Sequence, residues 1–255
     1  MPWNPQAYEA FADHRMRPAI DLLGRVAVES PRRIVDLGCG SGNVTLLLAQ
    51  RWPAARILGL DGSSEMLALA RSRSKTIDWQ ETELATWQPE EPFDLVYSNA
   101  ALHWLPDHAT LFPNLAKAVA PQGVLAVQMP SNFAAPSHAL IHELALEVPY
   151  RTHLEHRLRH DPVLEPGAYY GLLAKRFARI DIWTTEYLQV LQGENPVADW
   201  TRSTWLGGLL GALPEPLRVP FEAAYRRRVL GAYPKREDGS TLFAFRRLFM
   251  VATGA

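Results

Sequence analysis

The sequence predicts an α/β fold in which a mostly parallel sheet is followed by a helical cap. Between Arg32 and Met129, short β-branched runs alternate with longer runs of helical apolar spacing, as in successive βαβ units. A glycine-rich turn at 36–42 joins the first predicted strand to the helix after it. Beyond Met129 the alternation gives way to mainly helical sequence that ends in one last apolar run.

The first half supplies five of the predicted strands. Each is a compact apolar run that ends at a polar or glycine-bearing loop, and Pro53 and Pro121 mark helix ends. We predict strands at Arg33–Leu37, Arg56–Leu60, Thr76–Glu81, Phe93–Ser98 and Val124–Met129. We predict one or two helices within Tyr8–Val26, and single helices at Asn43–Gln50, Ser64–Ser72 and Leu111–Val119. Since the strands are parallel, their C-terminal ends should border one crevice.

The second half is predicted to form the cap and the last two strands. We predict helices at Pro136–Val148, Val197–Leu210 and Pro214–Tyr233, and strands at Arg179–Tyr187 and Thr241–Ala252. Pro149–Gly167 is expected to be a long charged connection. The chain then divides into an N-terminal helical segment (1–30), a ligand-binding core (31–135), a cap with one returning strand (136–240) and a final strand (241–255).

Composition excludes several classes of protein. The 255 residues are 47% hydrophobic and 21% charged, which are ordinary globular values. A net charge of -1 provides no positive field for nucleic acid, so we expect a small-molecule partner. No apolar run approaches the ~20 residues of a membrane span. Cys39 is the only cysteine and no signal peptide is evident, so we expect a cytoplasmic protein; the oligomeric state is not predicted.

The glycine-rich turn reads Asp36-Leu37-Gly38-Cys39-Gly40-Ser41-Gly42. Glycines at a strand-to-helix turn permit a tight bend and let a ligand approach backbone N–H groups. The dinucleotide fingerprint G-x-G-x-x-G requires glycine at position 43, where this chain has Asn43. The turn therefore indicates a nucleotide-like ligand other than NAD.

Two acidic residues follow the next strands. Asp61 lies at the end of the second strand, where a carboxylate can accept hydrogen bonds from both hydroxyls of a ribose. Glu83 follows the third strand and precedes Leu84, a pair suited to the amino group and the ring face of adenine. Each of these residues alone is also typical of an ordinary loop. Residues suited to a ligand at three successive strand ends, however, together favour a nucleoside ligand.

With these residues the sequence resembles class I methyltransferases that use S-adenosylmethionine (SAM). Their pattern is D-x-G-x-G-x-G, an acid at the second strand end, and an acid or amide after the third. The chain is similar in particular to the trans-aconitate 2-methyltransferase family, over nearly its whole length. The similar segments are Trp3-Asn4-Pro5, Arg17-Pro18-Ala19, Asp36 to Asn43, Arg51 to Ile57, Trp104 to His108, Pro121 to Pro130 and Arg247-Leu248-Phe249.

The resemblance implies a Rossmann-like class I methyltransferase fold, with a seven-stranded sheet whose last strand is antiparallel. It implies SAM as cofactor, S-adenosylhomocysteine as product, and methyl transfer to a carboxylate oxygen of a small di- or tricarboxylic acid, trans-aconitate. The implied cofactor residues are Gly38 and Gly40 for the methionine end, Asp61 for the ribose, Glu83 and Leu84 for adenine, and Asn99 beside the sulfonium; Asp36, the first residue of the motif, is a further cofactor-binding candidate.

The chain departs from the family on the side that faces the substrate. The family's T-G-L-R-P becomes Thr204-Trp205-Leu206-Gly207-Gly208 and loses an arginine suited to a carboxylate. F-P-R-L-F becomes Phe245-Arg246-Arg247-Leu248-Phe249, and M-P-D-N becomes Met129-Pro130-Ser131-Asn132. Two alternatives therefore stay open. The acceptor could be another small molecule or a carrier-bound acyl group, or the protein could bind SAM without transferring its methyl group.

A carboxylate acceptor needs no general base, because its pKa of about 4 leaves it ionised at neutral pH. His103 and Trp104 follow the fourth strand and are the candidate catalytic pair; closing the crevice is an equally good interpretation. Further candidates are Tyr8 and Arg17 for the cofactor, and Arg15, Arg202, Arg226 and Arg247 for the acceptor. The run Arg226-Arg227-Arg228 is also typical of a solvated helix face.

Histidines raise the alternative of a metal site. His138 and His142 are four residues apart on a predicted helix, and three more histidines follow at His153, His156 and His160. No acid at a strand end and no cysteine completes a familiar ligand spacing, so we expect no metal.

Overall fold

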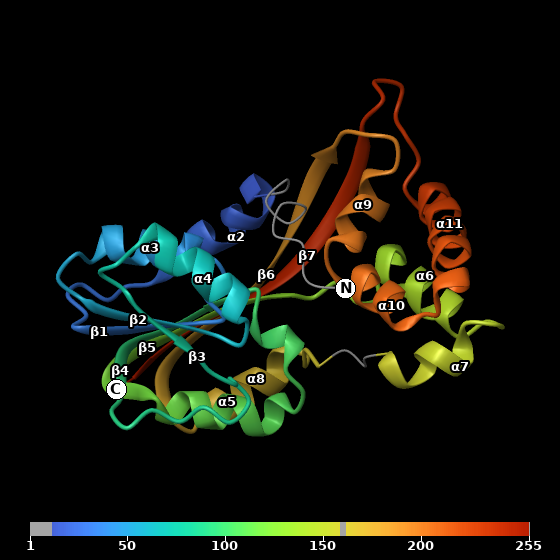
Figure 1. The fold of residues 1–255 in the computed structure, drawn as a ribbon. Helices are drawn as coiled ribbons and strands as arrows, with labels where there is room; N and C mark the ends of the chain where they lie inside the picture. Colours follow the sequence, from blue (N-terminus) through green and yellow to red (C-terminus); the bar gives the residue numbers. More distant parts are fainter. Residues whose placement is uncertain (1–11, 159–161, 255) are drawn as a thin grey trace. The chain divides into compact units, whose positions relative to one another are not determined.

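The computed structural model describes residues 12–158 and 162–254, with side chains from Met16 onward. In this part of the chain, seven strands form one sheet in the order β3-β2-β1-β4-β5-β7-β6 (Figure 1). Strands β1 to β5 pair in parallel, and β7 is antiparallel to β5. The strands are β1 Arg33–Leu37, β2 Arg56–Asp61, β3 Asp78–Glu81, β4 Phe93–Asn99, β5 Val119–Pro130, β6 Phe177–Leu191 and β7 Thr241–Gly254. The predicted fold class is confirmed.

The helices begin with recognisable signals. Ser63 Oγ accepts a hydrogen bond from the Met66 amide (3.3 Å) ahead of α4, and Asp107 Oδ1 accepts one from Thr110 (3.2 Å) ahead of α5. Proline occupies the first turn of α6, α8, α9 and α11. The α-helices are α2 Ala12–Arg25, α3 Asn43–Arg51, α4 Ser64–Arg73, α5 His108–Lys117, α6 Pro136–Ala145, α7 Arg151–Leu154, α8 Pro166–Leu173, α9 Pro196–Arg202, α10 Trp205–Ala212 and α11 Glu215–Ala232, and the 3-10 turns are η1 Leu102–Trp104 and η2 Glu155–Arg157.

The chain divides into two compact units. The core unit comprises Met16–Pro130, Asp161–Thr185 and Arg247–Ala255. The cap unit comprises Met1–Arg15, Ser131–His160 and Glu186–Arg246. The long strands β6 and β7 each contribute one end to the core unit and the other end to the cap unit.

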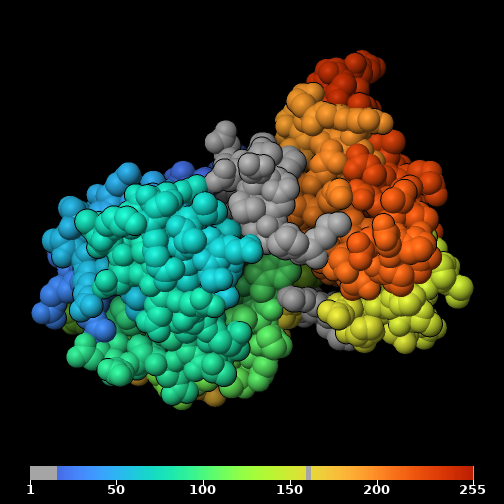
Figure 2. All heavy atoms as spheres, viewed as in Figure 1, coloured from blue at the N-terminus to red at the C-terminus, as the bar shows by residue number. Residues whose placement is uncertain are grey.

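Helices cover both faces of the sheet in the core unit. Helices α2, α3 and α4 lie on one face and α5 and α8 on the other (Figure 1). In Figure 2, α3 and α4, coloured blue to cyan, form part of the outer surface of the unit. On the α5 face, Val35, Val96 and Leu125 are fully or almost fully buried in one apolar cluster with Phe112. Burial on both faces explains why the central strands are continuous apolar runs.

The cap unit has an apolar cluster of its own. Helices α6, α9, α10 and α11 contribute to it, together with Phe243 and Phe245 of β7. Trp200 packs against both phenylalanines, with ring centroids 5.7 and 5.6 Å apart. At its centre Thr201 and Tyr225 share a buried hydrogen bond of 3.0 Å between their hydroxyls.

Some predicted elements were wrong in extent. The single helix Val197–Leu210 is two helices, because the hydroxyls of Ser203 and Thr204 bond to carbonyls of the preceding turn and Thr204 leaves the helical conformation. The connection Pro149–Gly167 contains α7 and the start of α8, which was not predicted. Val119 begins β5 rather than ending a helix, and β6 extends beyond the predicted strand at both ends. Within the described residues, every helix is too short or too polar to span a bilayer.

Candidate active site

The glycine-rich turn between β1 and α3 adopts backbone conformations that favour glycine. Gly38, Gly40 and Gly42 have φ of 73°, 55° and 82°. A Cβ on Gly38 would lie 2.1 Å from the Cβ of Ala101, and one on Gly42 would lie 2.7 Å from the Trp79 ring. Two of the glycines therefore also bring neighbouring segments close to the turn.

Asp61, at the end of β2, is hydrogen-bonded to this turn. Its Oδ2 accepts from the Gly40 amide (2.8 Å) and its Oδ1 from the Ser63 amide (2.9 Å). These bonds fix the carboxylate between the turn and the start of α4. Each carboxylate oxygen has further acceptor capacity, so the arrangement leaves room for the two ribose hydroxyls that the sequence predicted.

Asp36 is the last acid before the turn and is buried. Its Oδ2 accepts a hydrogen bond from Thr45 Oγ1 (2.6 Å), while its Oδ1 has no partner among the described residues. Burial raises the pKa of Asp36 to about 7; the Thr45 hydrogen bond opposes this rise and the charge of Asp61 adds to it. A buried acceptor of this kind fits a cationic ligand group, and SAM carries both an ammonium and a sulfonium.

Two more predicted cofactor residues lie near the turn and one lies in solvent. Leu84 is half-buried, with its Cδ1 3.8 Å from where a Gly38 Cβ would be. Asn99 ends β4 and has a buried Oδ1 with no partner among the described residues. Glu83 is exposed. The ends of β1, β2 and β4 thus form one polar edge of the core unit.

The candidate catalytic pair lies in η1, just after β4. His103 is buried and Trp104 is 41% exposed, with the two ring centroids 4.7 Å apart. The turn is held by His108, whose Nε2 bonds to the Leu102 carbonyl (3.0 Å) and whose Nδ1 contacts the Tyr169 hydroxyl. Burial lowers the pKa of His108, so the neutral ring donates from Nε2 and accepts at Nδ1. His108 lies in the family-like segment Trp104 to His108 but was not a predicted site residue.

Arg247 is the predicted acceptor residue that belongs to the core unit. It lies on β7 opposite Pro130 of β5 and is 3% exposed. Its Nη1 donates to Oε1 of Gln128 at 3.4 Å. Gln128 was not a predicted site residue, although a polar residue inside the apolar run Val124–Met129 is itself a signal.

The other predicted binding residues are located as follows. Arg17 lies in α2 and is exposed. Arg15 lies in the same helix, but its side chain is outside the described part of the structure, and Tyr8 lies outside the described residues altogether.

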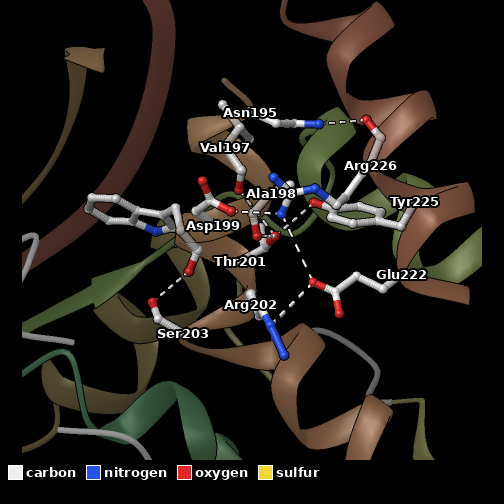
Figure 3. A network of polar contacts seen from close by, with 11 residues as sticks. Asn195, Val197, Ala198, Asp199, Thr201, Arg202, Ser203, Glu222, Tyr225 and Arg226 are labelled. Atoms are coloured by element: carbon white, nitrogen blue, oxygen red, sulfur yellow. Dashed lines mark hydrogen bonds and ion pairs between the residues drawn. The ribbon is translucent and has the colours of Figure 1, made fainter. Parts of the chain in front are cut away.

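The candidate arginines of the cap unit pair with acids of the same unit (Figure 3). Arg226 Nη1 lies 2.7 Å from Asp199 Oδ1 and 4.0 Å from Glu222 Oε1. Arg202 Nε lies 3.2 Å from the same Glu222 oxygen. Both arginines therefore have intramolecular counterions.

The position where the family has an arginine is crowded in this chain. A Cβ on Gly207 would lie 2.5 Å from the Arg202 carbonyl oxygen. Trp205 stacks on His138, with centroids 5.5 Å apart and an interplanar angle of 22°. Burial lowers the pKa of His138 to about 4, which leaves this ring neutral. No group of three or more metal-binding side chains occurs among the described residues.

Comparison with known proteins agrees with this geometry. Residues 34–123 match a family model described as a methyltransferase domain. The chain is 46% identical over 256 residues to trans-aconitate 2-methyltransferase of Methylobacterium radiotolerans, covering 99% of this chain and 98% of that protein. This chain belongs to the trans-aconitate 2-methyltransferase family. It is a SAM-dependent methyltransferase.

Solved structures show the same fold at lower identity. The YcgJ protein from Bacillus subtilis superposes with a TM-score of 0.61 at 13% identity, covering 93% of this chain and 98% of that one. Phosphoethanolamine N-methyltransferase 2 from Haemonchus contortus, solved with S-adenosyl-L-methionine, gives 0.54 at 15% identity, covering 94% of this chain and 53% of that one. At these identities the likeness extends to the fold and not to the acceptor.

Proposed function

We propose that this methyltransferase transfers the methyl group of SAM to a carboxylate oxygen of trans-aconitate, or of a closely similar small di- or tricarboxylic acid. The observation that carries the proposal is Arg247, a buried guanidinium in the middle of β7, opposite the end of β5 and in the same unit as the glycine turn and Asp61. Arginine binds carboxylates through charge-assisted hydrogen bonds. The name of the relatives, at 46% and 44% identity over almost the full chain, supports trans-aconitate as the acid.

The residues of this chain would bind and align the two reactants. SAM supplies an electrophilic methyl group on a sulfonium. In the proposal, Asp61 binds the ribose, Asp36 the cationic methionine end, and Leu84 the adenine ring. Since the acceptor carboxylate is already ionised at neutral pH, no residue has to remove a proton. Alignment of the nucleophile and exclusion of water then supply the rate enhancement.

The candidate pair His103 and Trp104 fits a role in excluding water. The two rings lie side by side directly after β4, and Trp104 is exposed enough to contact a ligand. The proposal assigns this pair to closing the acceptor site and assigns no proton transfer to His103. It also places the enzyme in the cytoplasm with a free small molecule as its partner, and the free, buried thiol of Cys39 fits that setting.

A labelling experiment tests the acceptor. Purified enzyme is incubated with methyl-labelled SAM and, separately, with trans-aconitate, other di- and tricarboxylates, carrier-bound acyl groups and neutral acceptors. We expect label in a monomethyl ester that mild alkali releases, with trans-aconitate as the best acceptor. Label only in neutral or carrier-bound acceptors would overturn the proposal. SAM binding without transfer to any acceptor would favour a binding protein instead.

A further inference from the structure

Three polar side chains lie on one face of three neighbouring strands in the core unit. Asn99 of β4 is the register partner of Gln128 of β5, so both side chains point to the same face of the sheet. Arg247 of β7 pairs with Pro130, two residues beyond Gln128 on that same face. The row Asn99, Gln128, Arg247 thus crosses the edge at which the parallel strands end.

Gln128 has an amide nitrogen that the protein does not use. The residue is fully buried, and its Nε2 has no hydrogen-bond partner among the described residues. The orientation of the amide is fixed, because Oε1 accepts from Arg247 and a flipped amide would place one donor against another. A buried donor without an acceptor is unfavourable, so the site is built to receive an acceptor atom from a ligand.

The polarity of the row changes from one strand to the next. The end nearest the glycine turn carries the unpartnered acceptor Oδ1 of Asn99, and the other end carries donors on Gln128 and Arg247. Neighbouring strands are about 4.8 Å apart. The acceptor end therefore suits the cationic methyl donor, while the donor end suits an anionic acceptor next to it.

We propose that Gln128 is a specificity-determining residue for the methyl acceptor, donating from Nε2 to a carboxylate of the acceptor that Arg247 also binds. The inference rests on the proposed function, because it presupposes a carboxylic acid. It adds a neutral donor beside the guanidinium, which makes the site selective for a group that accepts at both positions. An uncharged amide in place of that carboxylate presents a donor as well as an acceptor and binds less well.

Three variants separate this role from a structural one. Gln128→Met retains the length of the side chain and removes the donor. Gln128→Glu replaces the donor with a charge that pairs with Arg247 and repels a carboxylate. Ser98→Ala is the matched control: Ser98 is equally buried on β4, points to the opposite face, and donates to the Leu37 carbonyl at 2.9 Å.

Two measurements are made on the full chain. Titration calorimetry with enzyme saturated in S-adenosylhomocysteine gives the Kd for trans-aconitate, and kinetics give kcat and KM for trans-aconitate and for one of its monoamides. We expect Gln128→Met to raise Kd and KM for the acid roughly 10- to 100-fold, the range for one hydrogen bond to a charged group. Gln128→Glu should raise them further and reduce the preference for the acid over the monoamide at least 10-fold. Affinity for SAM should change less than 3-fold in both.

The results divide cleanly between the two proposals. If wild-type enzyme methylates trans-aconitate and neither Gln128 variant changes its Kd or KM by more than 3-fold, this inference is wrong and the proposed function stands. The same conclusion follows if Ser98→Ala has an equal effect on the acid. If wild-type enzyme neither binds nor methylates any carboxylic acid, the proposed function and this inference both fail.

Discussion

The candidate site residues of the core unit differ from the candidate arginines of the cap unit in how their polar groups are paired. In the core unit, buried oxygens of Asp36 and Asn99 and the amide nitrogen of Gln128 have no partner among the described residues. In the cap unit, Arg202 and Arg226 are paired with acids. For these candidate residues, an unpartnered buried atom near a strand end indicates a ligand site, whereas an ion pair with an acid of the same unit indicates a structural role. An arginine that looks suitable in the sequence is therefore a weaker guide than the partners it already has.

The two units also differ in how closely they follow the family pattern. The glycine turn and Asp61 of the core unit match it, and the structure accounts for both through close approach and backbone hydrogen bonds. The cap unit departs from it at Trp205 and Gly207, where the backbone leaves no room for a larger side chain at Gly207. If the acceptor is a carboxylic acid, its recognition has to rely on groups other than that lost arginine.

The largest effect is expected from filling the glycine turn. Gly38→Ala forces a Cβ to within 2.1 Å of Ala101 at a positive φ. Overpacking and backbone strain together should destabilise the protein by about 3 kcal/mol and weaken SAM binding at least 100-fold. Thermal unfolding and calorimetry measure the two effects. Gly24→Ala is the control, since nothing lies within 4 Å of its Cβ position. An equal loss of stability and SAM affinity in Gly24→Ala would contradict the special role of Gly38.

The next effect is expected at the end of β2. Asp61→Ala removes an acceptor for the Gly40 and Ser63 amides and for a ribose, so Kd for SAM should rise roughly 10-fold or more. Asp78→Ala is the control, because Asp78 forms a surface ion pair with Arg56 outside the turn. Calorimetric affinity for SAM that is unchanged in Asp61→Ala would contradict the site assignment.

A smaller effect is expected from pH, through Asp36. Its pKa of about 7 in the folded protein means that the carboxyl group is largely neutral at pH 6 and ionised at pH 8. Since SAM is cationic, its affinity should fall about 10-fold between pH 8 and pH 6. Calorimetry across this range measures the slope, and Asp36→Asn should abolish it. If the SAM affinity of Asp36→Asn still depends on pH as it does in the wild type, a group other than Asp36 causes the dependence.

The same residue should affect stability without ligand in the opposite direction. Between pH 4 and pH 7 the folded protein retains on Asp36 a proton that the unfolded chain has lost, because the folded-state pKa is raised. The contribution of Asp36 to the free energy of unfolding therefore decreases as pH rises through that window. Comparing denaturant unfolding of the wild type and Asp36→Asn at pH 5 and pH 8 isolates this contribution.

The smallest effect is expected in the cap unit. Arg226→Ala breaks ion pairs with Asp199 and Glu222, and because the side chains are partly exposed the loss of stability should stay below about 1 kcal/mol. If its role is structural, KM for the acceptor should change less than 3-fold. A 10-fold rise in KM with unchanged thermal stability would instead indicate that Arg226 binds the acceptor. It would contradict the purely structural role assigned here to the cap arginines.

Several elements could be predicted from local sequence alone. Strands β1, β2 and β4 were placed to within one residue, because both faces of the sheet are covered there and these strands are mainly apolar, whereas β5 begins five residues before the predicted strand. Helix α8 was missed, since eight residues that include Gly167 and Gly171 give little periodic signal; packing of its buried Tyr169 and Leu173 stabilises it. The break between α9 and α10 depends on hydroxyl hydrogen bonds that no pattern of apolar residues reveals.

The sequence by itself determined the fold class and the methyl donor, because the glycine turn and Asp61 act through backbone geometry set by neighbouring residues. Only the tertiary structure decided which polar groups have unused hydrogen-bonding capacity and which are already paired. Asn99, Gln128 and Arg247 are far apart in the chain and adjoin only through strand register. Arg202 and Arg226 lie on separate helices and share Glu222 only because those helices pack together. Whether two polar side chains form a hydrogen bond or an ion pair depends on their distance in space, and the spacing of residues along the chain does not reveal that distance.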